Sequence, residues 1–164
     1  MTQHFKEQHP ELQHIVRELL WVREHNFKCV EAGRRNQLLF FAEGALVLIA
    51  LERFVRIVVG SEATDSDTLY NLLQRAVSKE LLILPWDDQN DGIGKIKAVR
   101  NSLLHGNYEQ AAKLAGCESV VDFFGSSQFI SEIECLFHVV VDLMRQIDIS
   151  TGKPTGVAPL QVPR

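Results

Sequence analysis

The sequence predicts an all-α fold, an up-and-down bundle of four long helices plus a shorter one. Its 164 residues suit a single domain that buries a core without disulfides or metals. Apolar residues recur at intervals of three and four over nearly the whole chain, which is the spacing of one helix face. Five such segments are joined by short polar loops, and none alternates apolar and polar residues as a strand would.

The first two predicted helices account for the N-terminal third of the chain. The first begins at Pro10, because proline suits the first turn of a helix, and its apolar positions extend to Val30. The second runs from about residue 35 to 59 and is apolar on most of its faces. A helix of that composition lies either at the centre of a bundle or in contact with a second subunit.

Three further helices follow after polar loops. The third runs over residues 69–81, the fourth begins near Gly92, and the last spans about residues 126–147. Because the C-terminal residues are rich in glycine and proline, we expect residues 1–150 to form the domain and residues 151–164 a flexible tail. The candidates for capping the third helix are Asp65, Ser66 and Asp67, and the apolar face of the fourth carries Ile93, Ile96, Val99 and Leu103.

The composition predicts a cytoplasmic protein without a membrane anchor. Hydrophobic residues make up 46% and charged residues 23%, close to the average of soluble domains. The longest apolar run contains Glu43 and is too short to span a bilayer. The N-terminus lacks the apolar run of a signal peptide. Three cysteines without metal-ligand spacing are typical of buried or free thiols in a reducing compartment.

The charge balance limits the partners. Lysine and arginine total 17 against 21 acidic residues, a net charge of -4. Proteins that hold nucleic acid through its phosphates alone carry a clustered basic face. Here basic residues cluster only at Arg34–Arg35 and in the trio Lys95, Lys97 and Arg100. This argues against tight, non-specific binding of nucleic acid and is compatible with a brief catalytic encounter with RNA.

The stretch VRNSLLHGNY places three chemically versatile side chains at a predicted helix end. Asn101 and His105 are four residues apart and share a helix face, whereas Arg100 lies roughly 140° away but has a long side chain. Gly106 predicts the end of the helix. Histidine acts as acid or base near neutral pH, and arginine binds phosphate oxygens with a planar fork. The same residues are also typical of ordinary helix capping.

This stretch resembles the signature of the HEPN superfamily, in which an arginine precedes a histidine by four to six residues late in a small helical domain. Here the match is Arg100, four residues and His105, with the polar Asn101 directly after the arginine. The resemblance implies a HEPN-like homodimer whose two motifs face one cleft and cleave single-stranded RNA without a metal or other cofactor. Such proteins occur as toxins of toxin–antitoxin pairs and in phage defence, often with a regulatory partner protein.

The resemblance also suggests roles for individual residues. Arg100 would bind the scissile phosphate, His105 would act as acid or base, and Asn101 would orient one of them or the substrate. In one toxin subgroup a tyrosine two residues after the histidine is modified by a partner enzyme. Tyr108 is one position later, so we expect it to pack or to contact substrate instead. The residues expected to contact RNA are Tyr108, Lys95, Lys97 and Asn107.

Two carboxylates interrupt the apolar second helix. A buried carboxylate must be paired, so Glu43 and Glu52 should either lie at an edge or face a cation. Glu52 can pair with Arg56, its i+4 neighbour. In the functional alternative, one of the two glutamates orients Arg100 or His105.

Two further patterns bear on metal binding and on function. The Glu11-x-x-His14 sequence occurs once, and Glu134 and His138 are four apart, so no complete carboxylate-bridged metal site is expected. A second interpretation of the whole chain is a non-enzymatic interaction module. In that case the bundle presents its surface to a partner, and the polar residues near His105 only cap a helix.

Overall fold

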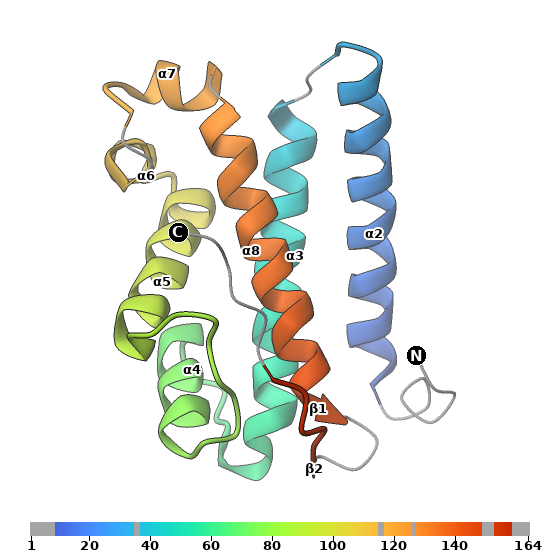
Figure 1. The fold of residues 1–164 in the computed structure, drawn as a ribbon, viewed down its shortest axis with the longest axis vertical. Helices are drawn as coiled ribbons and strands as arrows, with labels where there is room; N and C mark the ends of the chain where they lie inside the picture. Colours follow the sequence, from blue (N-terminus) through green and yellow to red (C-terminus); the bar gives the residue numbers. More distant parts are fainter. Residues whose placement is uncertain (1–8, 35–36, 115–116, 126, 149–152, 159–164) are drawn as a thin grey trace.

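The computed structural model describes residues 9–34, 37–114, 117–125, 127–148 and 153–158, and these are predominantly helical. This confirms the all-α prediction. Four long helices form an elongated bundle (Figure 1), and shorter helical segments connect them. The long helices are α2 (Pro10–Glu31), α3 (Gln37–Val59), α5 (Gln89–His105) and α8 (Ser127–Gln146). The shorter segments are η1 (Gly60–Glu62), α4 (Leu69–Ser78), α6 (Tyr108–Leu114) and α7 (Val120–Gly125).

Helix α3 lies at the centre of the bundle and contacts α2, α4, α5 and α8. The composition of this helix was compatible with the centre of the bundle or with contact to a second subunit, and the structure shows it at the centre. Gly44 permits a close approach of three helices, because an added Cβ would lie 2.6 Å from Ile133 Cδ1 and 2.9 Å from Leu103 Cδ1. The fully buried side chains of α3 include Val47, Leu51, Phe54 and Val55.

The loops before α4 and α5 differ from the sequence prediction in which residues cap the helices. Thr68 caps α4 and accepts a hydrogen bond from the Asn71 amide at 3.3 Å, so none of the predicted candidates is the cap. Asp67 instead accepts hydrogen bonds from the Arg75 guanidinium. Asp88 caps α5, which consequently begins at Gln89 rather than near Gly92.

The described residues after α8 include a short pair of strands. Strand β1 (Ile147–Asp148) pairs antiparallel with β2 (Lys153–Pro154). The Thr155 amide then donates to the Gln146 carbonyl at 2.8 Å, and its hydroxyl donates to the Arg145 carbonyl at 2.6 Å. Residues 153–155 thus fold back on the end of α8, and the predicted boundary at residue 150 lies outside the described residues.

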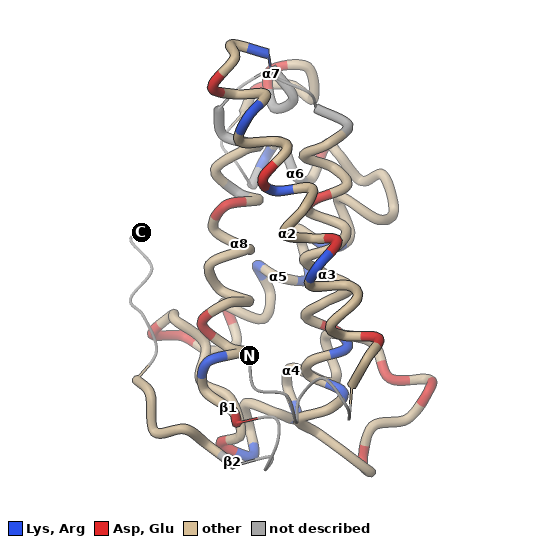
Figure 2. The backbone as a smooth tube through the Cα atoms, turned by 90° about the vertical axis from the view of Figure 1, so that its right-hand side faces the viewer, with Lys and Arg blue, Asp and Glu red and all other residues tan. Residues whose placement is uncertain are grey.

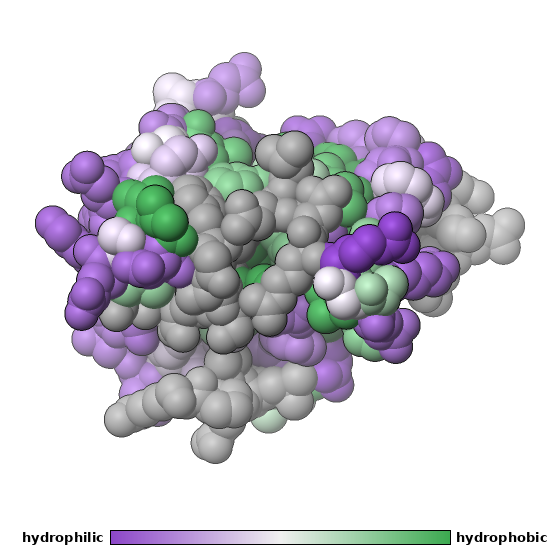
Figure 3. Space-filling model, turned by 90° about the horizontal axis from the view of Figure 1, so that it is seen from above, coloured by the Kyte–Doolittle hydropathy of each residue, from purple (hydrophilic) through white to green (hydrophobic). Residues whose placement is uncertain are grey.

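Charges of both signs are interspersed along the helices, as Figure 2 shows for the side that carries α2 and α8. Seen from the end that carries α7, apolar side chains lie in separate patches between polar ones (Figure 3). Among the described residues, no helix combines the length and the apolar character needed to cross a membrane.

Candidate functional site

The predicted motif lies at the C-terminal end of α5. The helix ends at His105 because Gly106 adopts the left-handed conformation (φ 69°, ψ 21°), which confirms the predicted stop. His105 is exposed, whereas Arg100 and Asn101 are half-buried. The buried side chains of Ile93 and Ile96, which lie along the helix face of Arg100, anchor α5 against the core. The polar end of a well-anchored helix therefore faces solvent.

Arg100 and His105 are in contact. Arg100 Nη1 lies 3.3 Å from His105 Nε2, so the long arginine side chain does reach across the helix surface. A guanidinium carries only N–H donors, so Nε2 must be the acceptor. The contact places an imidazole nitrogen directly beside a cation that can bind a phosphate.

Arg100 and Asn101 also line a pocket of about 150 Å³ between α4 and α5. Lys97 and Tyr70 line the same pocket, and Lys97 Nζ lies 4.6 Å from the centroid of the Tyr70 ring. Buried apolar side chains of both helices complete the lining. Arg100 thus links His105 on one side to this pocket on the other.

The remaining predicted substrate contacts separate into two groups. Lys97 shares the pocket with Arg100, whereas Lys95 pairs with Asp91 at 3.2 Å. Lys95 also lies 5.8 Å from the Trp86 ring centroid. Residues that are two positions apart on a helix point about 200° away from each other, so Lys95 and Lys97 lie in different surroundings.

After Gly106, Asn107 connects α5 to α6, and Tyr108 is the first residue of α6. Asn107 is exposed, and its amide nitrogen donates to Gln110 Oε1 at 3.0 Å. The Tyr108 ring meets Phe41 edge to face, with 5.6 Å between the ring centroids. Tyr108 therefore packs against α3 while remaining near the end of α5, which agrees with one of its two expected roles.

Glu43 and Glu52 do not serve the motif, which corrects the suggestion that either orients Arg100 or His105. Glu52 Oε1 lies 3.0 Å from Arg56 Nη2, the predicted i+4 pair. Glu43 lies on the α2 side of α3, where its carboxylate accepts one hydrogen bond from Arg23 and one from Asn26, each at 2.7 Å.

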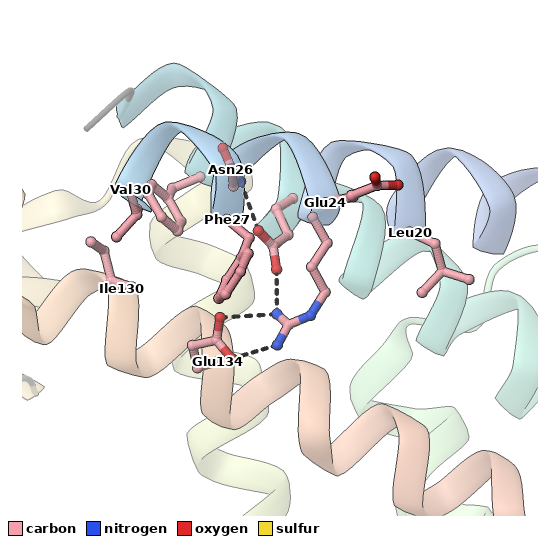
Figure 4. A pocket seen from close by; sticks show the side chains of 10 residues that line it. Leu20, Glu24, Asn26, Phe27, Val30, Ile130 and Glu134 are labelled. Atoms are coloured by element: carbon pink, nitrogen blue, oxygen red, sulfur yellow. Dashed lines mark hydrogen bonds and ion pairs between the residues drawn. The ribbon is translucent and has the colours of Figure 1, made fainter. Parts of the chain in front are cut away.

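Sequence reasoning missed the arginine that pairs with Glu43. Arg23 Nη1 also donates to Glu134 Oε1 at 3.0 Å and Nη2 to Glu134 Oε2 at 2.6 Å, so α2, α3 and α8 are tied by one guanidinium (Figure 4). The Arg23 guanidinium carbon lies 3.8 Å from the Phe137 ring centroid. Burial alone would lower the pKa of Arg23, but the hydrogen bonds to both carboxylates outweigh it and raise the pKa.

A cavity of about 380 Å³ lies beside this ion-pair cluster. Its polar lining includes Arg23, Glu43 and Glu134, and its apolar lining includes Leu20, Phe27, Val30 and Ile130 (Figure 4). Phe27 and Leu20 are 62% and 51% exposed, so the rim of the cavity is apolar. The cavity is lined by residues of α2, α3 and α8. The motif lies on α5, which Figure 1 shows on the other side of α3 and α8 from α2.

The residues considered for metal binding have other partners. Glu11 pairs with Arg53 at 2.8 Å, and His14 Nδ1 lies 2.7 Å from Arg17 Nη2. His138 Nε2 is 3.8 Å from Glu134 Oε2. Among the described residues, no group of three or more histidine, cysteine or acidic side chains is arranged to hold a metal ion.

Comparison of the chain with protein-family models, with curated proteins and with solved structures finds no match. The functional assignment therefore depends on the residues at the end of α5, on their contacts and on the resemblance of their spacing to the HEPN signature. Of the three expected catalytic residues, Arg100 and His105 are in direct contact, and Asn101 lines the adjoining pocket.

Proposed function

We propose that this protein is a HEPN-like, metal-independent endoribonuclease that acts on single-stranded RNA as a homodimer in the cytoplasm, in a toxin or defence role. The observation that carries the proposal is the contact between Arg100 Nη1 and His105 Nε2 at the exposed end of α5. It joins a proton acceptor and a phosphate-binding cation, which are the groups that RNA cleavage without a metal requires.

The contact suggests a sequence of bond changes. As Arg100 turns its N–H groups to the phosphate, Nε2 of His105 is released and takes the proton of a ribose 2′-hydroxyl, and the 2′-oxygen forms a bond to the adjacent phosphorus. Arg100 stabilises the negative charge on the phosphate oxygens as the bond to the 5′-oxygen breaks. The leaving 5′-oxygen takes a proton from the imidazolium of the second copy's motif. The products are a 2′,3′-cyclic phosphate and a 5′-hydroxyl.

The chain offers a matched pair of histidines for testing this proposal. Purified protein is incubated with synthetic single-stranded RNA in excess EDTA, beside His105→Ala and His138→Ala. Both histidines are exposed, but His138 lies on α8, outside the motif. General acid–base catalysis contributes about 10²–10⁴-fold, so we expect His105→Ala to lose at least about 100-fold in rate and His138→Ala to match the wild type. Equal cleavage by all three would contradict the proposal.

A second candidate function is supported by the exposed apolar residues of α2. Trp21 and Phe27 are 60% and 62% exposed, and Phe27 lines the cavity that Arg23 also lines. Exposed apolar patches of this kind mark interaction sites. In this alternative the protein is a non-catalytic module that associates through α2, and the Arg100 and His105 side chains only cap α5.

The two functions differ in which side of the bundle faces the second copy. Association through α2 would leave the two α5 ends on outer sides, because α2 and α5 flank the bundle from opposite sides (Figure 1). Sedimentation of Phe27→Asp distinguishes them. The nuclease function predicts an unchanged dimer, whereas the interaction module predicts dissociation to monomers.

A further inference from the structure

The pocket beside Arg100 is lined by cations that lack acidic partners. No carboxylate oxygen of the described residues lies within 4.0 Å of Lys97 Nζ or of the Arg100 guanidinium. Elsewhere in the described part, a carboxylate pairs with Arg23, Arg53, Arg56, Arg75, Lys79 and Lys95.

The lining of the pocket combines these cations with an apolar floor. Leu73, Ile93 and Ile96 are buried and contribute apolar surface, and Tyr70 contributes a half-buried aromatic ring. The volume of 150 Å³ corresponds to about five water molecules at roughly 30 Å³ each. The pocket therefore fits a single ring-sized group rather than a larger molecule.

Asn101 gives the pocket a group that can recognise the edge of a ring. Within the described part of the chain, the Asn101 side-chain amide makes no hydrogen bond. An amide offers two donors and an acceptor, which match the polar edge of a nucleobase. An apolar floor, an aromatic wall, an amide and two cations together suit a flat heterocycle attached to an anion.

We propose that this pocket binds one nucleobase of the RNA, directly beside the phosphate that Arg100 holds. The inference rests on the proposed nuclease function. The bound base would belong to a nucleotide next to the scissile bond. Arg100 makes the connection, because Nη1 contacts His105 while its other N–H donors remain for the phosphate. Lys97 adds a second cation for the same phosphate or its neighbour.

The consequence is a base preference of the enzyme. A base in the pocket contributes affinity through the apolar floor and the Tyr70 ring, and Asn101 selects among bases by its hydrogen bonds. Lys97 contributes to the binding of any anion. The binding affinity thus has one contribution that depends on the base and one that depends on charge. Substitution of Tyr70 should remove the first, and substitution of Lys97 should weaken the second.

Titration calorimetry of the full chain tests both parts. The probes are each nucleoside 3′-monophosphate, ribose 5-phosphate and inorganic phosphate. For the wild type we expect at least one nucleotide to bind about tenfold more tightly than ribose 5-phosphate. Tyr70→Leu should reduce this ratio to near unity. Lys97→Gln should weaken all anions, while Lys28→Gln, an exposed lysine on α2, should change nothing.

Two results would overturn the inference: ribose 5-phosphate binding as tightly as every nucleotide, or a ratio unchanged in Tyr70→Leu. Because Tyr70 is half-buried, thermal melting confirms that this variant folds, and the exposed Lys97 gives an independent variant. The RNA assay in EDTA separates the two proposals. Cleavage without base-dependent binding overturns only the pocket. Base-dependent binding without cleavage supports the pocket and contradicts the nuclease.

Discussion

Arg23 and Arg100 lie on helices at opposite sides of the bundle, and their surroundings differ in kind. Arg23 faces two carboxylates, one of which, Glu43, has a side chain only 1% exposed. Arg100 has no carboxylate within 4.0 Å among the described residues and contacts Nε2 of His105 instead. One guanidinium is satisfied by the protein itself, whereas the other keeps its capacity to bind an external anion.

The comparison teaches how to separate a structural arginine from a functional one. Three helices converge on Arg23, so its hydrogen bonds hold α2, α3 and α8 in register. Among the described residues, the only hydrogen bond of the Arg100 side chain is to His105 of its own helix, so no ion pair between helices is lost when Arg100 is removed. Stability and activity should therefore respond to different arginines.

The largest loss of stability is expected for Arg23→Ala. The change leaves the Glu43 carboxylate buried with Asn26 as its remaining partner, which typically costs about 3–5 kcal/mol. Urea denaturation at pH 7 measures it. Arg17→Ala is the control, because its side chain is 72% exposed, and should cost less than about 0.5 kcal/mol. Similar losses for both variants would remove the distinction between the two sides of the bundle.

Of the two carboxylates that bind Arg23, the more buried one should contribute more to the free energy of unfolding. Glu43→Ala removes a buried acceptor of two hydrogen bonds and should lower the free energy of unfolding by about 2–3 kcal/mol. Glu134→Ala should cost less than about 1 kcal/mol, because its side chain is 40% exposed. Urea denaturation of the two variants in parallel decides the order. A larger loss for Glu134→Ala would show that bidentate geometry outweighs burial.

A third arginine, Arg75, pairs with Asp67, and the contribution of this pair to stability should depend on pH. The hydrogen bond from Arg75 lowers the pKa of Asp67 from 3.8 to about 2. Since the pKa is lower in the folded state, the pair stabilises the fold above about pH 4, and this contribution disappears as the pH falls towards 2. We expect Asp67→Asn to melt below the wild type at pH 6. The difference should narrow as the pH falls from about 4 to 2, and a constant difference would contradict the assignment.

The smallest change in stability is expected for Arg100→Ala. Because Arg100 bonds only His105 at the exposed end of α5, its removal should alter the free energy of unfolding by less than about 0.5 kcal/mol. The same urea experiment measures it. A loss comparable to that of Arg23→Ala would mean that Arg100 is also a structural residue.

The sequence predicted what depends on local spacing. Apolar residues at helical intervals identified the long helices, because an amphipathic helix must bury one face. Gly106 ended α5 as expected, because glycine adopts the left-handed conformation without strain. The Glu52–Arg56 pair followed from their i+4 spacing. Contact between Arg100 and His105 could be anticipated from the length of the arginine side chain.

The remainder depends on contacts between distant segments. Arg23 is 20 residues from Glu43 and 111 from Glu134, so no local pattern links them. Tyr70 joins the pocket of Arg100 only because α4 packs on α5. The two-residue strands after α8 are too short to show any periodicity. For these features the tertiary structure, rather than the intrinsic preference of each residue, decides the outcome.

The central claim is that Arg100 serves a reaction while Arg23 serves the fold. The most direct measurement compares RNA cleavage in excess EDTA by the wild type, Arg100→Ala and Arg23→Lys, at a temperature where all three are folded. We predict that Arg100→Ala loses at least about 100-fold in rate, as expected when a charge-stabilising donor is removed, while Arg23→Lys cleaves at the wild-type rate. Equal rates for Arg100→Ala and the wild type would contradict the claim.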